Sequence, residues 1–419
     1  MKHSSLEIDS IAYGGKGVAR IDGKVFFVQD TVPGDVVDII VTKDTKSFAE
    51  AEVENWVKRS QIRVPSPCQY SDECGGCQWQ EVPYKTQITW KKSFVVDALK
   101  RIAKLEHIPK LTIHPSPDHL NYRNRILLRV HVERNKQPKI GFFKTASRDL
   151  IAIDKCKIAR RLLNRFITDL SKLRLDVPDQ KFRLEIQELP LTSQVAATFH
   201  PADPRIKGLD SFVEAVKGWD YTAWAGTYKD VKQSPHLNFD EHLDRRFLTQ
   251  PGQFQQVNFY HNQTLRNLIA TKVEECDVKT ILDLFCGSGN LSLALANGQR
   301  YIEGIEFNKN AIAVARANVK ANRLSNISYF SGDAAKHIAK LKTKFDMIIV
   351  DPPRQGMADS LALLGKVDPK YILYVSCDPN TFARDIGRLI PMGYKLMSLD
   401  CFDFFPATFH IESFAVLTK

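Results

Sequence analysis

Apolar and polar positions follow three different patterns along the chain. Residues 1–62 contain short β-rich runs, such as Lys24–Val28, divided by turn signals such as Pro33-Gly34. Several short strands in so small a span predict a barrel of the OB type, and the pattern fits a barrel with or without a binding role. We expect a central α+β domain to follow at 63–248 and a C-terminal α/β domain at 249–419, where apolar strands alternate with helices.

The central part contains one clear helix and one amphipathic strand. Apolar residues recur with a 3.6-residue rhythm over 84–104, which predicts the helix. Side chains alternate over 122–133, where successive residues of a strand point to opposite faces. One face carries Ile126, Leu128, Val130 and Val132, and the other carries Arg123, Arg125, Arg129 and His131. A basic front can be a solvated strand face, but three arginines together favour contact with phosphate groups.

The C-terminal part predicts a parallel, doubly wound sheet. Its apolar runs are Thr280–Phe285, Tyr301–Glu306, Met347–Val350 and Tyr371–Ser376, with helical stretches between them. Apolar strands joined by helices are typical of a parallel sheet that is covered on both faces. Such sheets bind ligands at the carboxyl ends of their strands, so the residues that follow each strand are the candidates for a site.

The first of these strands leads into a turn that contains Gly287 and Gly289. Glycines let the backbone approach a ligand closely, and the missing third glycine of the dinucleotide fingerprint argues against NAD. Glu306 ends the next strand, where an acid can accept hydrogen bonds from ribose hydroxyls, and Asp333 is placed to reach an adenine amino group. Asp351 follows the strand Met347–Val350. Any one of these acids can cap a helix instead, but together they favour a nucleoside ligand and resemble the class I S-adenosylmethionine-dependent methyltransferases.

Composition predicts a soluble, cytoplasmic protein. Apolar residues make up 43% and charged residues 26% of the 419 residues, and no apolar run suits a transmembrane helix or a signal peptide. The net charge is +11, and residues 61–160 carry most of it, with 19 Lys and Arg against 9 Asp and Glu. A surplus concentrated in one segment predicts contact with nucleic acid there, because a uniformly solvated surface would spread it.

Eight cysteines in a cytoplasmic protein favour metal binding or catalysis over disulfides. Cys68, Cys74 and Cys77 form a C-x5-C-x2-C group, which supplies three thiolates. The candidates for a fourth are Cys156, Cys276, Cys286 and Cys401. Four cysteines suit a structural zinc ion or a [4Fe–4S] cluster, and their spacing leaves both open.

Cys377 follows the last of the predicted strands. Pro379 suits the first turn of a helix, so the thiol is expected at a helix N-terminus. That position lowers the pKa of a thiol and suits a nucleophile. In an arbitrary α/β protein a small buried cysteine is the commoner explanation, but Cys377 lies at the edge of the sheet where the cofactor is expected.

Five motifs together resemble the RNA 5-methyluridine methyltransferase family. They are Tyr374–Pro379, Asp351–Gly356, His410–Ser413, Leu284–Asn290 and Gln253–Asn258. With the barrel and the cysteine group added, the resemblance spans essentially the whole chain. It is nearest to the branch that carries a TRAM domain and an iron–sulfur cluster and that modifies 23S rRNA.

The resemblance implies a role for each residue. Cys377 would add to carbon 6 of uracil, because carbon 5 is otherwise too weak a nucleophile to take a methyl group from S-adenosylmethionine. Glu412 would then remove the carbon 5 proton, and Asp351 would bind the uracil edge or its surroundings. Cofactor contacts are expected from Gln256, Phe285, Gly287, Asn290, Glu306, Asp333 and Asp351. The target base must leave its stack, and Arg123, Arg125 and Arg129 would bind the RNA.

The same resemblance makes Cys156 the fourth ligand of a structural [4Fe–4S] cluster that holds the basic segment in shape. It also implies that the helix at 84–104 packs against the catalytic domain. We expect 23S rRNA as the substrate, with the T-loop uridine of transfer RNA as an alternative. An RNA amino-methyltransferase, suggested by Asp351-Pro-Pro, and a non-catalytic RNA-binding protein are less favoured alternatives. We further expect a monomer with no membrane partner.

Overall fold

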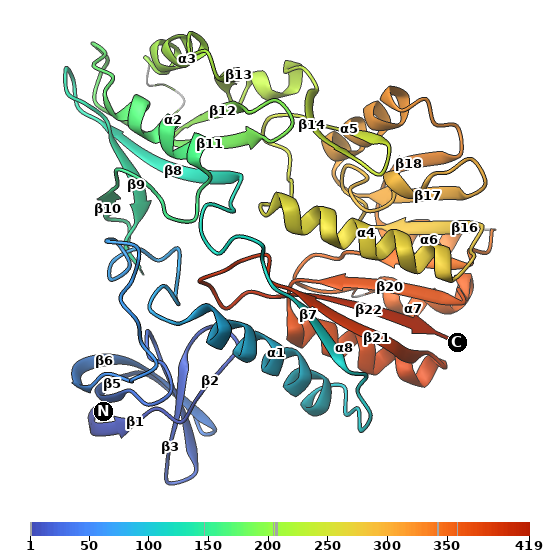
Figure 1. Ribbon diagram of the computed structural model, residues 1–419, viewed down its shortest axis with the longest axis horizontal. Helices are drawn as coiled ribbons and strands as arrows, with labels where there is room; N and C mark the ends of the chain where they lie inside the picture. The colour runs from blue at the N-terminus through green and yellow to red at the C-terminus, as the bar shows by residue number, and fades with distance from the viewer. Residues whose placement is uncertain (1, 146, 204, 206–207, 342, 358) are drawn as a thin grey trace.

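The computed structural model contains three large sheets (Figure 1). It describes residues 2–145, 147–203, 205, 208–341, 343–357 and 359–419. In Figure 1 the N-terminal sheet lies at the lower left, the central sheet at the upper left and the C-terminal sheet on the right. Within the described residues, no helix has both the length and the apolar character needed to cross a membrane.

The N-terminal sheet has six strands in the order β1-β5-β6-β4-β3-β2. Its strands are β1 (Lys2–Glu7), β2 (Ser10–Ile11), β3 (Gly17–Ile21), β4 (Lys24–Val28), β5 (Val36–Asp44) and β6 (Phe48–Lys58). They enclose a single apolar core, in which Ile8, Val28 and Ile39 are at most 1% exposed. The chain therefore forms the small domain of short strands that its sequence predicts.

The central sheet has six strands in the order β10-β9-β8-β11-β12-β13. They are β8 (Arg125–Val132), β9 (Lys139–Phe143), β10 (Leu150–Ala152), β11 (Gln180–Leu189), β12 (Gln194–Pro201) and β13 (Thr222–Thr227). The helices α2 (Arg161–Ser171) and α3 (Leu209–Lys217) bury their apolar sides against it. Residues of β8 alternate as predicted, because Ile126, Leu128, Val130 and Val132 are buried in this core.

The C-terminal sheet has eight strands in the order β18-β17-β16-β19-β20-β22-β21-β7. Seven of them are β16 (Thr280–Leu284), β17 (Tyr301–Glu306), β18 (Ile327–Ser331), β19 (Met347–Val350), β20 (Tyr371–Ser376), β21 (Lys395–Phe402) and β22 (Glu412–Thr418). The helices are α4 (Phe259–Glu275), α5 (Lys309–Ala321), α6 (Ala334–Lys340), α7 (Asp359–Val367) and α8 (Pro379–Leu389). One apolar core joins the sheet to α6, α7 and α8, and a second joins it to α4 and α5, so both faces are covered.

Shorter elements connect these parts. A hairpin of β14 (Leu237–His242) and β15 (Arg245–Thr249) precedes α4. The 3-10 helices are η1 (Asp230–Gln233), η2 (Leu293–Leu295) and η3 (Ile390–Met392).

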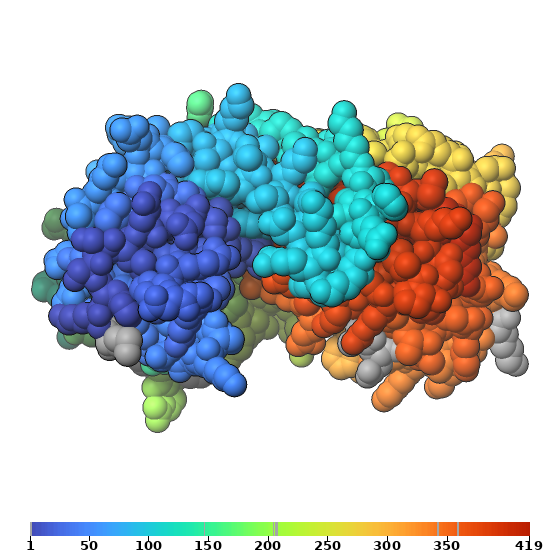
Figure 2. Space-filling model, turned by 90° about the horizontal axis from the view of Figure 1, so that it is seen from below, coloured from blue at the N-terminus to red at the C-terminus, as the bar shows by residue number. Residues whose placement is uncertain are grey.

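The C-terminal sheet is only partly parallel. Strands β18 to β20 are parallel as predicted, whereas β22 runs antiparallel to both β20 and β21. The far edge is β7 (Leu111–His114), which lies within the expected central range but pairs with β21. Helix α1 (Tyr84–Arg101) packs on α8, as the family resemblance implies, and a Cβ at Gly387 would lie 3.0 Å from the Cα of Ala103. Figure 2 shows the segment around residue 100, in cyan, against the orange and red C-terminal part.

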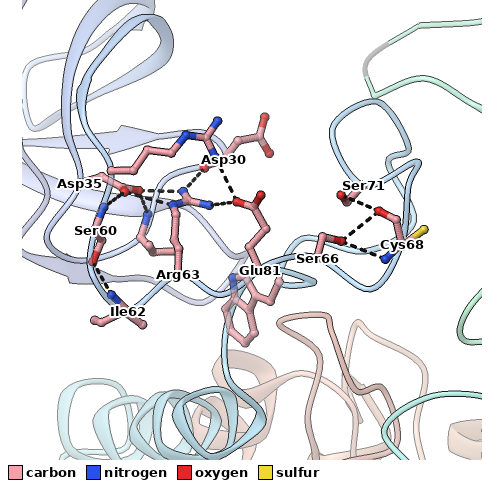
Figure 3. A network of polar contacts seen from close by, with 12 residues as sticks. Asp30, Asp35, Ser60, Ile62, Arg63, Ser66, Cys68, Ser71 and Glu81 are labelled. Atoms are coloured by element: carbon pink, nitrogen blue, oxygen red, sulfur yellow. Dashed lines mark hydrogen bonds and ion pairs between the residues drawn. The ribbon is translucent and has the colours of Figure 1, made fainter.

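A network of ion pairs connects the barrel to the segment that follows it (Figure 3). Arg63 donates hydrogen bonds to Asp35 at 2.7 Å, to Glu81 at 2.6 Å and to the main-chain oxygen of Asp30 at 2.9 Å. Asp35 is fully buried and also accepts a hydrogen bond from the amide of Ser60. A buried carboxylate with this many donors is satisfied despite its burial. The network therefore holds the barrel against the chain that leads to the cysteine group.

Candidate active site

Two side chains with predicted catalytic roles and one predicted to bind uracil meet at the carboxyl end of the C-terminal sheet. Ser376 at the end of β20 pairs with Ser413 of β22, so the next pair in this antiparallel register is Cys377 and Glu412. Opposite residues of antiparallel strands have Cα atoms about 5 Å apart. Asp351 follows β19, which is the parallel neighbour of β20. The predicted nucleophile, base and uracil-binding residue are therefore close neighbours.

The local sequence explains why Cys377 lies between a strand and a helix. Asp378 is the N-cap of α8, and its carboxylate accepts hydrogen bonds from the amides of Asn380 and Thr381, both at 2.9 Å. Pro379 occupies the first turn of the helix, as predicted. The helix begins directly after the thiol, and Cys377 is only partly buried.

Burial and like charge dominate the electrostatics of the two carboxyl groups. Burial raises the pKa of Glu412 well above its usual range, and the neighbouring Asp351 adds to the shift. Burial also raises the pKa of Asp351. Glu412 is only 3% exposed. Because the two carboxyl groups are adjacent and buried, the charged form of each disfavours ionisation of the other.

The expected lowering of the Cys377 pKa is wrong. The pKa of this thiol is raised to about 12, first by burial and then by the charges of Glu412 and Asp351, whereas Arg354 opposes the shift. A helix N-terminus favours a thiolate by a modest free energy, so burial and the two carboxyl groups outweigh it. The thiol therefore keeps its proton until substrate binding changes its surroundings.

The turn after β16 is shaped to admit a ligand. Phe285 and Gly287 have positive φ angles of 64° and 55°, which bend the chain sharply. At Gly289 the φ angle is +84° and a Cβ would lie 2.4 Å from the Tyr329 hydroxyl, so only glycine fits. Glu306, at the end of β17, accepts a hydrogen bond from the amide of Gly287 at 3.3 Å. This contact brings the acid predicted to bind ribose against the glycine turn.

A carboxylate beside this turn has no partner. Asp283 is 1% exposed, and neither of its carboxylate oxygens accepts a hydrogen bond from the residues that the structure describes. Burial raises its pKa to about 7, Ser292 opposes the shift, and the charges of Asp351 and Glu306 add to it. A buried acid without donors costs free energy until a ligand supplies them. The site therefore fits S-adenosylmethionine, whose ammonium and hydroxyl groups are donors.

Two of the predicted cofactor residues are engaged with the protein itself. The side-chain oxygen of Asn290 accepts hydrogen bonds from Arg266 at 2.6 Å and from an asparagine of α4 at 2.9 Å. Arg266 is itself buried and paired with Asp240 at 2.5 Å. Asp333 is the N-cap of α6, the alternative considered for these acids. Asn290 thus shapes the turn, and Gln256 lies buried just before α4.

The three predicted RNA-binding arginines have different surroundings. Arg125 donates to Glu185 at 2.6 Å and to the main-chain oxygen of Gln253 at 3.1 Å, so it ties the central sheet to the segment before α4. Arg123 donates to the main-chain oxygen of Arg125 at 3.0 Å. Arg129 lies over an aromatic ring, with 4.6 Å between the guanidinium carbon and the ring centre.

The four cysteines predicted to bind a cluster line one cavity in the central part. Its volume is about 250 Å³, and Cys68, Cys74, Cys77 and Cys156 all belong to its wall. The pKa of the Cys77 thiol is raised to about 12, mainly by burial, and the charges of the other three cysteines add to the shift. The four sulfur atoms therefore lie near one another. The remaining candidates, Cys276, Cys286 and Cys401, do not belong to this wall.

Two distant segments are held together around the cysteine cavity. The Tyr70 hydroxyl donates to Asp154 at 2.7 Å, and the amide of Cys156 donates to Asn164 at 2.8 Å. Among the described residues, no three cysteine, histidine or carboxylate side chains form a group that could hold one metal ion. The cavity is also far larger than the roughly 15 Å³ that one water needs.

Three residues at the catalytic site were not singled out from the sequence. Arg354 stands inside the motif Asp351–Gly356, and Asp283 lies in the predicted strand Thr280–Phe285, so their positions beside Cys377 and the glycine turn were within reach of sequence analysis. Tyr13 belongs to the N-terminal barrel, and its hydroxyl donates to the main-chain oxygen of Cys377 at 3.2 Å. The sequence around Tyr13 predicts only a turn. Its contact with Cys377 has no local sequence pattern, because 364 residues separate the two partners.

Comparisons with known proteins identify the parts of this chain. A family model described as "tRNA (Uracil-5-)-methyltransferase" matches residues 239–419, and one described as "TRAM domain" matches residues 5–53. The tRNA (uracil-54, C5)-methyltransferase of Pyrococcus abyssi, solved in complex with S-adenosyl-L-homocysteine, has a similar fold. The TM-score is 0.68 at 24% identity, and the match covers 100% of both chains. The C-terminal domain is thus a class I methyltransferase fold, and the N-terminal barrel is a TRAM domain.

Relatives of similar length define the family. The 23S rRNA (uracil(1939)-C(5))-methyltransferase RlmD of Legionella pneumophila (strain Paris) is 30% identical over 435 residues, which cover 99% of this chain and 97% of the relative. The protein of the same name from Shewanella woodyi is 31% identical over 430 residues, with 98% and 95% covered. The chain therefore belongs to the RNA uracil-C5-methyltransferase family, and the predicted S-adenosylmethionine-dependent RNA methyltransferase activity is confirmed.

Proposed function

We propose that this enzyme methylates carbon 5 of one uridine in 23S rRNA, with Cys377 as the nucleophile and Glu412 as the base. The strand register that pairs Cys377 with Glu412 beside Asp351 supports the reaction. The choice of RNA is supported by two relatives that match over nearly the whole chain and are named for uracil 1939 of 23S rRNA. We further propose that the enzyme acts as a monomer.

The first step forms a covalent bond to the base. The Cys377 thiol passes its proton to the ionised member of the Asp351–Glu412 pair, and its sulfur bonds to carbon 6 of uracil. The electron pair of the C5–C6 double bond moves toward oxygen 4, so carbon 5 becomes nucleophilic. Bound S-adenosylmethionine supplies the methyl group that carbon 5 takes. The ring must reach a sulfur at the floor of the site, so the uridine has left its base stack.

Release of the product needs a second proton transfer. After methylation, carbon 5 carries both the methyl group and its original hydrogen. The carboxyl pair returns its first proton to solvent, and Glu412 then takes the carbon 5 proton. The electron pair restores the C5–C6 double bond as the bond from carbon 6 to sulfur breaks, and the departing thiolate takes a proton back from the carboxyl pair. A carboxylate whose pKa is raised by burial is a stronger base than an exposed one, which supports this role for Glu412.

We also propose that Cys68, Cys74, Cys77 and Cys156 hold a [4Fe–4S] cluster. The four thiols line one cavity, and the family resemblance favours a cluster over zinc. All four ligands are then cysteines, which leaves no open iron, so the role is structural. The cluster would join two segments, 68–77 and 154–156, which lie near the two ends of the basic segment 61–160.

The outer face of the central sheet is the proposed contact for the RNA backbone. Arg129 of β8 lies directly opposite Arg183 of β11, and His131 lies opposite Lys181. Like charges in opposite positions of a sheet are destabilising, and an anion between them removes that cost. Arg125 is already paired with Glu185, so it orients the sheet and leaves phosphate contact to its neighbours.

A methyl-transfer assay on separate RNAs tests the substrate. Unmodified 23S rRNA and unmodified transfer RNA are incubated with the enzyme and radioactive S-adenosylmethionine, and the labelled nucleoside and its position are determined. Label in 5-methyluridine at a single 23S position is the expected result. Label confined to the T-loop of transfer RNA would move the assignment to that RNA, and label in a methylated amino group would contradict the proposed reaction.

A further inference from the structure

The TRAM barrel contacts the catalytic site through one short turn. Residues 12–16 join β2 to β3. The amide of Ala12 donates to the main-chain oxygen of Lys16 at 2.9 Å, and the amide of Gly15 donates to the main-chain oxygen of Ala12 at 3.0 Å. Gly14 and Gly15 have φ angles of +105° and +79°, which glycine adopts without strain. The turn is therefore tightly closed, and it presents Tyr13 in a defined position.

Tyr13 is held on both sides by aromatic rings of the catalytic part. Its ring meets Phe94 of α1 edge-on at 5.9 Å and Phe409 edge-on at 5.6 Å, measured between ring centres. A Cβ at Gly15 would lie 3.0 Å from Phe409, so the turn and this ring are in close contact. Phe409 lies in the loop between β21 and β22, three residues before Glu412. The barrel therefore touches the loop that leads into β22, and Glu412 is the first residue of that strand.

The Tyr13 hydroxyl reaches the nucleophile's own main chain. It donates to the carbonyl oxygen of Cys377 at 3.2 Å, and Asp378 is close enough for its charge to raise the pKa of Tyr13, after burial as the main cause. A hydrogen bond to this carbonyl restrains the peptide between Cys377 and Asp378. Because this peptide is bonded to the Cα of Cys377, restraining the peptide also restrains the position of the Cβ from which Sγ projects.

We propose that Tyr13 is a positioning residue for the methyl-transfer reaction, by which the docked TRAM barrel fixes the Cys377 peptide for attack on carbon 6. This inference rests on the proposed role of Cys377. It gives the barrel a part in the chemical step in addition to any part in binding RNA. Small displacements of a reacting atom raise the activation barrier, so losing one such restraint lowers the rate even where folding is unaffected.

A matched pair of tyrosine substitutions tests the proposal. Tyr13→Phe keeps the aromatic contacts and removes only the hydroxyl. Tyr394→Phe is the control. The Tyr394 hydroxyl also donates to a main-chain oxygen, that of Pro369 at 2.8 Å, but Pro369 precedes the start of β20, at the end of the strand away from Cys377. For each protein we would measure the single-turnover rate of adduct formation with 5-fluorouridine RNA, the Kd for that RNA and the Tm.

The expected result is a five- to tenfold slower adduct rate for Tyr13→Phe, in line with the loss of about one hydrogen bond, with the Kd and Tm unchanged. Tyr394→Phe should keep the wild-type rate. An unchanged rate for Tyr13→Phe, or a change confined to the Kd or the Tm, would overturn the proposal, because the barrel would then serve only binding or packing. Gly15→Ala, which keeps the hydroxyl but displaces the turn from Phe409, should also slow the adduct.

The same assay separates this inference from the proposed function. If the wild-type protein forms no adduct, or forms it at a residue other than Cys377, the proposed reaction fails whatever Tyr13 does. If the wild-type adduct maps to Cys377 and Tyr13→Phe forms it at the same rate, only the positioning role fails.

Discussion

The reactivity of the Cys377 thiol without RNA gives a quantitative prediction. A thiol with a pKa of about 12 is ionised in about one molecule in ten thousand at pH 8, against about one in ten for the ordinary value of 9. A thiolate of higher pKa is intrinsically more nucleophilic, and a pKa that is higher by three recovers a factor of about 20 in the alkylation rate. Iodoacetamide should therefore alkylate Cys377 about 50-fold more slowly than a cysteine peptide at pH 8.

Mass spectrometry of peptides after timed alkylation measures this rate, with Cys377→Ala locating the signal. Arg354→Met should slow the alkylation further, because the positive charge that opposes the pKa shift is removed. Asp351→Asn should accelerate it, because one of the charges that raise the pKa is gone. Alkylation of the wild-type protein as fast as the peptide, with a midpoint at or below pH 9, would refute the reasoning and restore the helix N-terminus as the dominant influence.

Three further substitutions test the site around the cofactor and the cluster. Arg266→Met leaves the buried Asp240 without its charged partner, so the free energy of unfolding in urea should fall by about 3–5 kcal/mol, and a loss below about 1 kcal/mol would contradict a buried pair. Glu306→Gln removes a charged hydrogen-bond acceptor, so calorimetry should show S-adenosylhomocysteine binding weakened by about tenfold or more; an unchanged Kd would remove Glu306 from the cofactor site. Cys77→Ser should abolish bound iron and acid-labile sulfide in anaerobically purified protein, whereas Cys276→Ser should leave both intact; zinc in the wild-type protein instead would contradict the cluster.

The parts predicted well from the sequence are those whose signal is local. Strands β17, β19 and β20 begin and end where their apolar runs do, since a buried parallel strand needs apolar residues on both faces. The N-cap Asp378 and Pro379 place Cys377 before α8 by short-range chemistry alone. The strand bounds and the start of α8 together predict which edge of the sheet carries the catalytic residues.

The parts that were missed depend on contacts between distant residues. Lys91 lies inside a predicted helix, where a charged side chain is expected in solvent, yet it is fully buried and paired with Asp403 at 2.5 Å. No local pattern pairs β7 with β21, because the choice of edge is made by packing of α1 against α8. The pKa of Cys377 was misjudged for the same reason: its helix is visible in the sequence, whereas its burial beside Glu412 is a property of the folded chain.

The central claim is that Cys377 forms a covalent bond with uracil, and a trapping assay tests it most directly. Wild-type protein and Cys377→Ala are each incubated with S-adenosylmethionine and a 23S rRNA fragment that contains 5-fluorouridine, and both are run on a denaturing gel. Fluorine at carbon 5 cannot leave as a proton, so the wild-type protein should stall as a protein–RNA adduct that Cys377→Ala does not form. Absence of any adduct, while the wild-type protein still methylates unmodified RNA, would contradict the account.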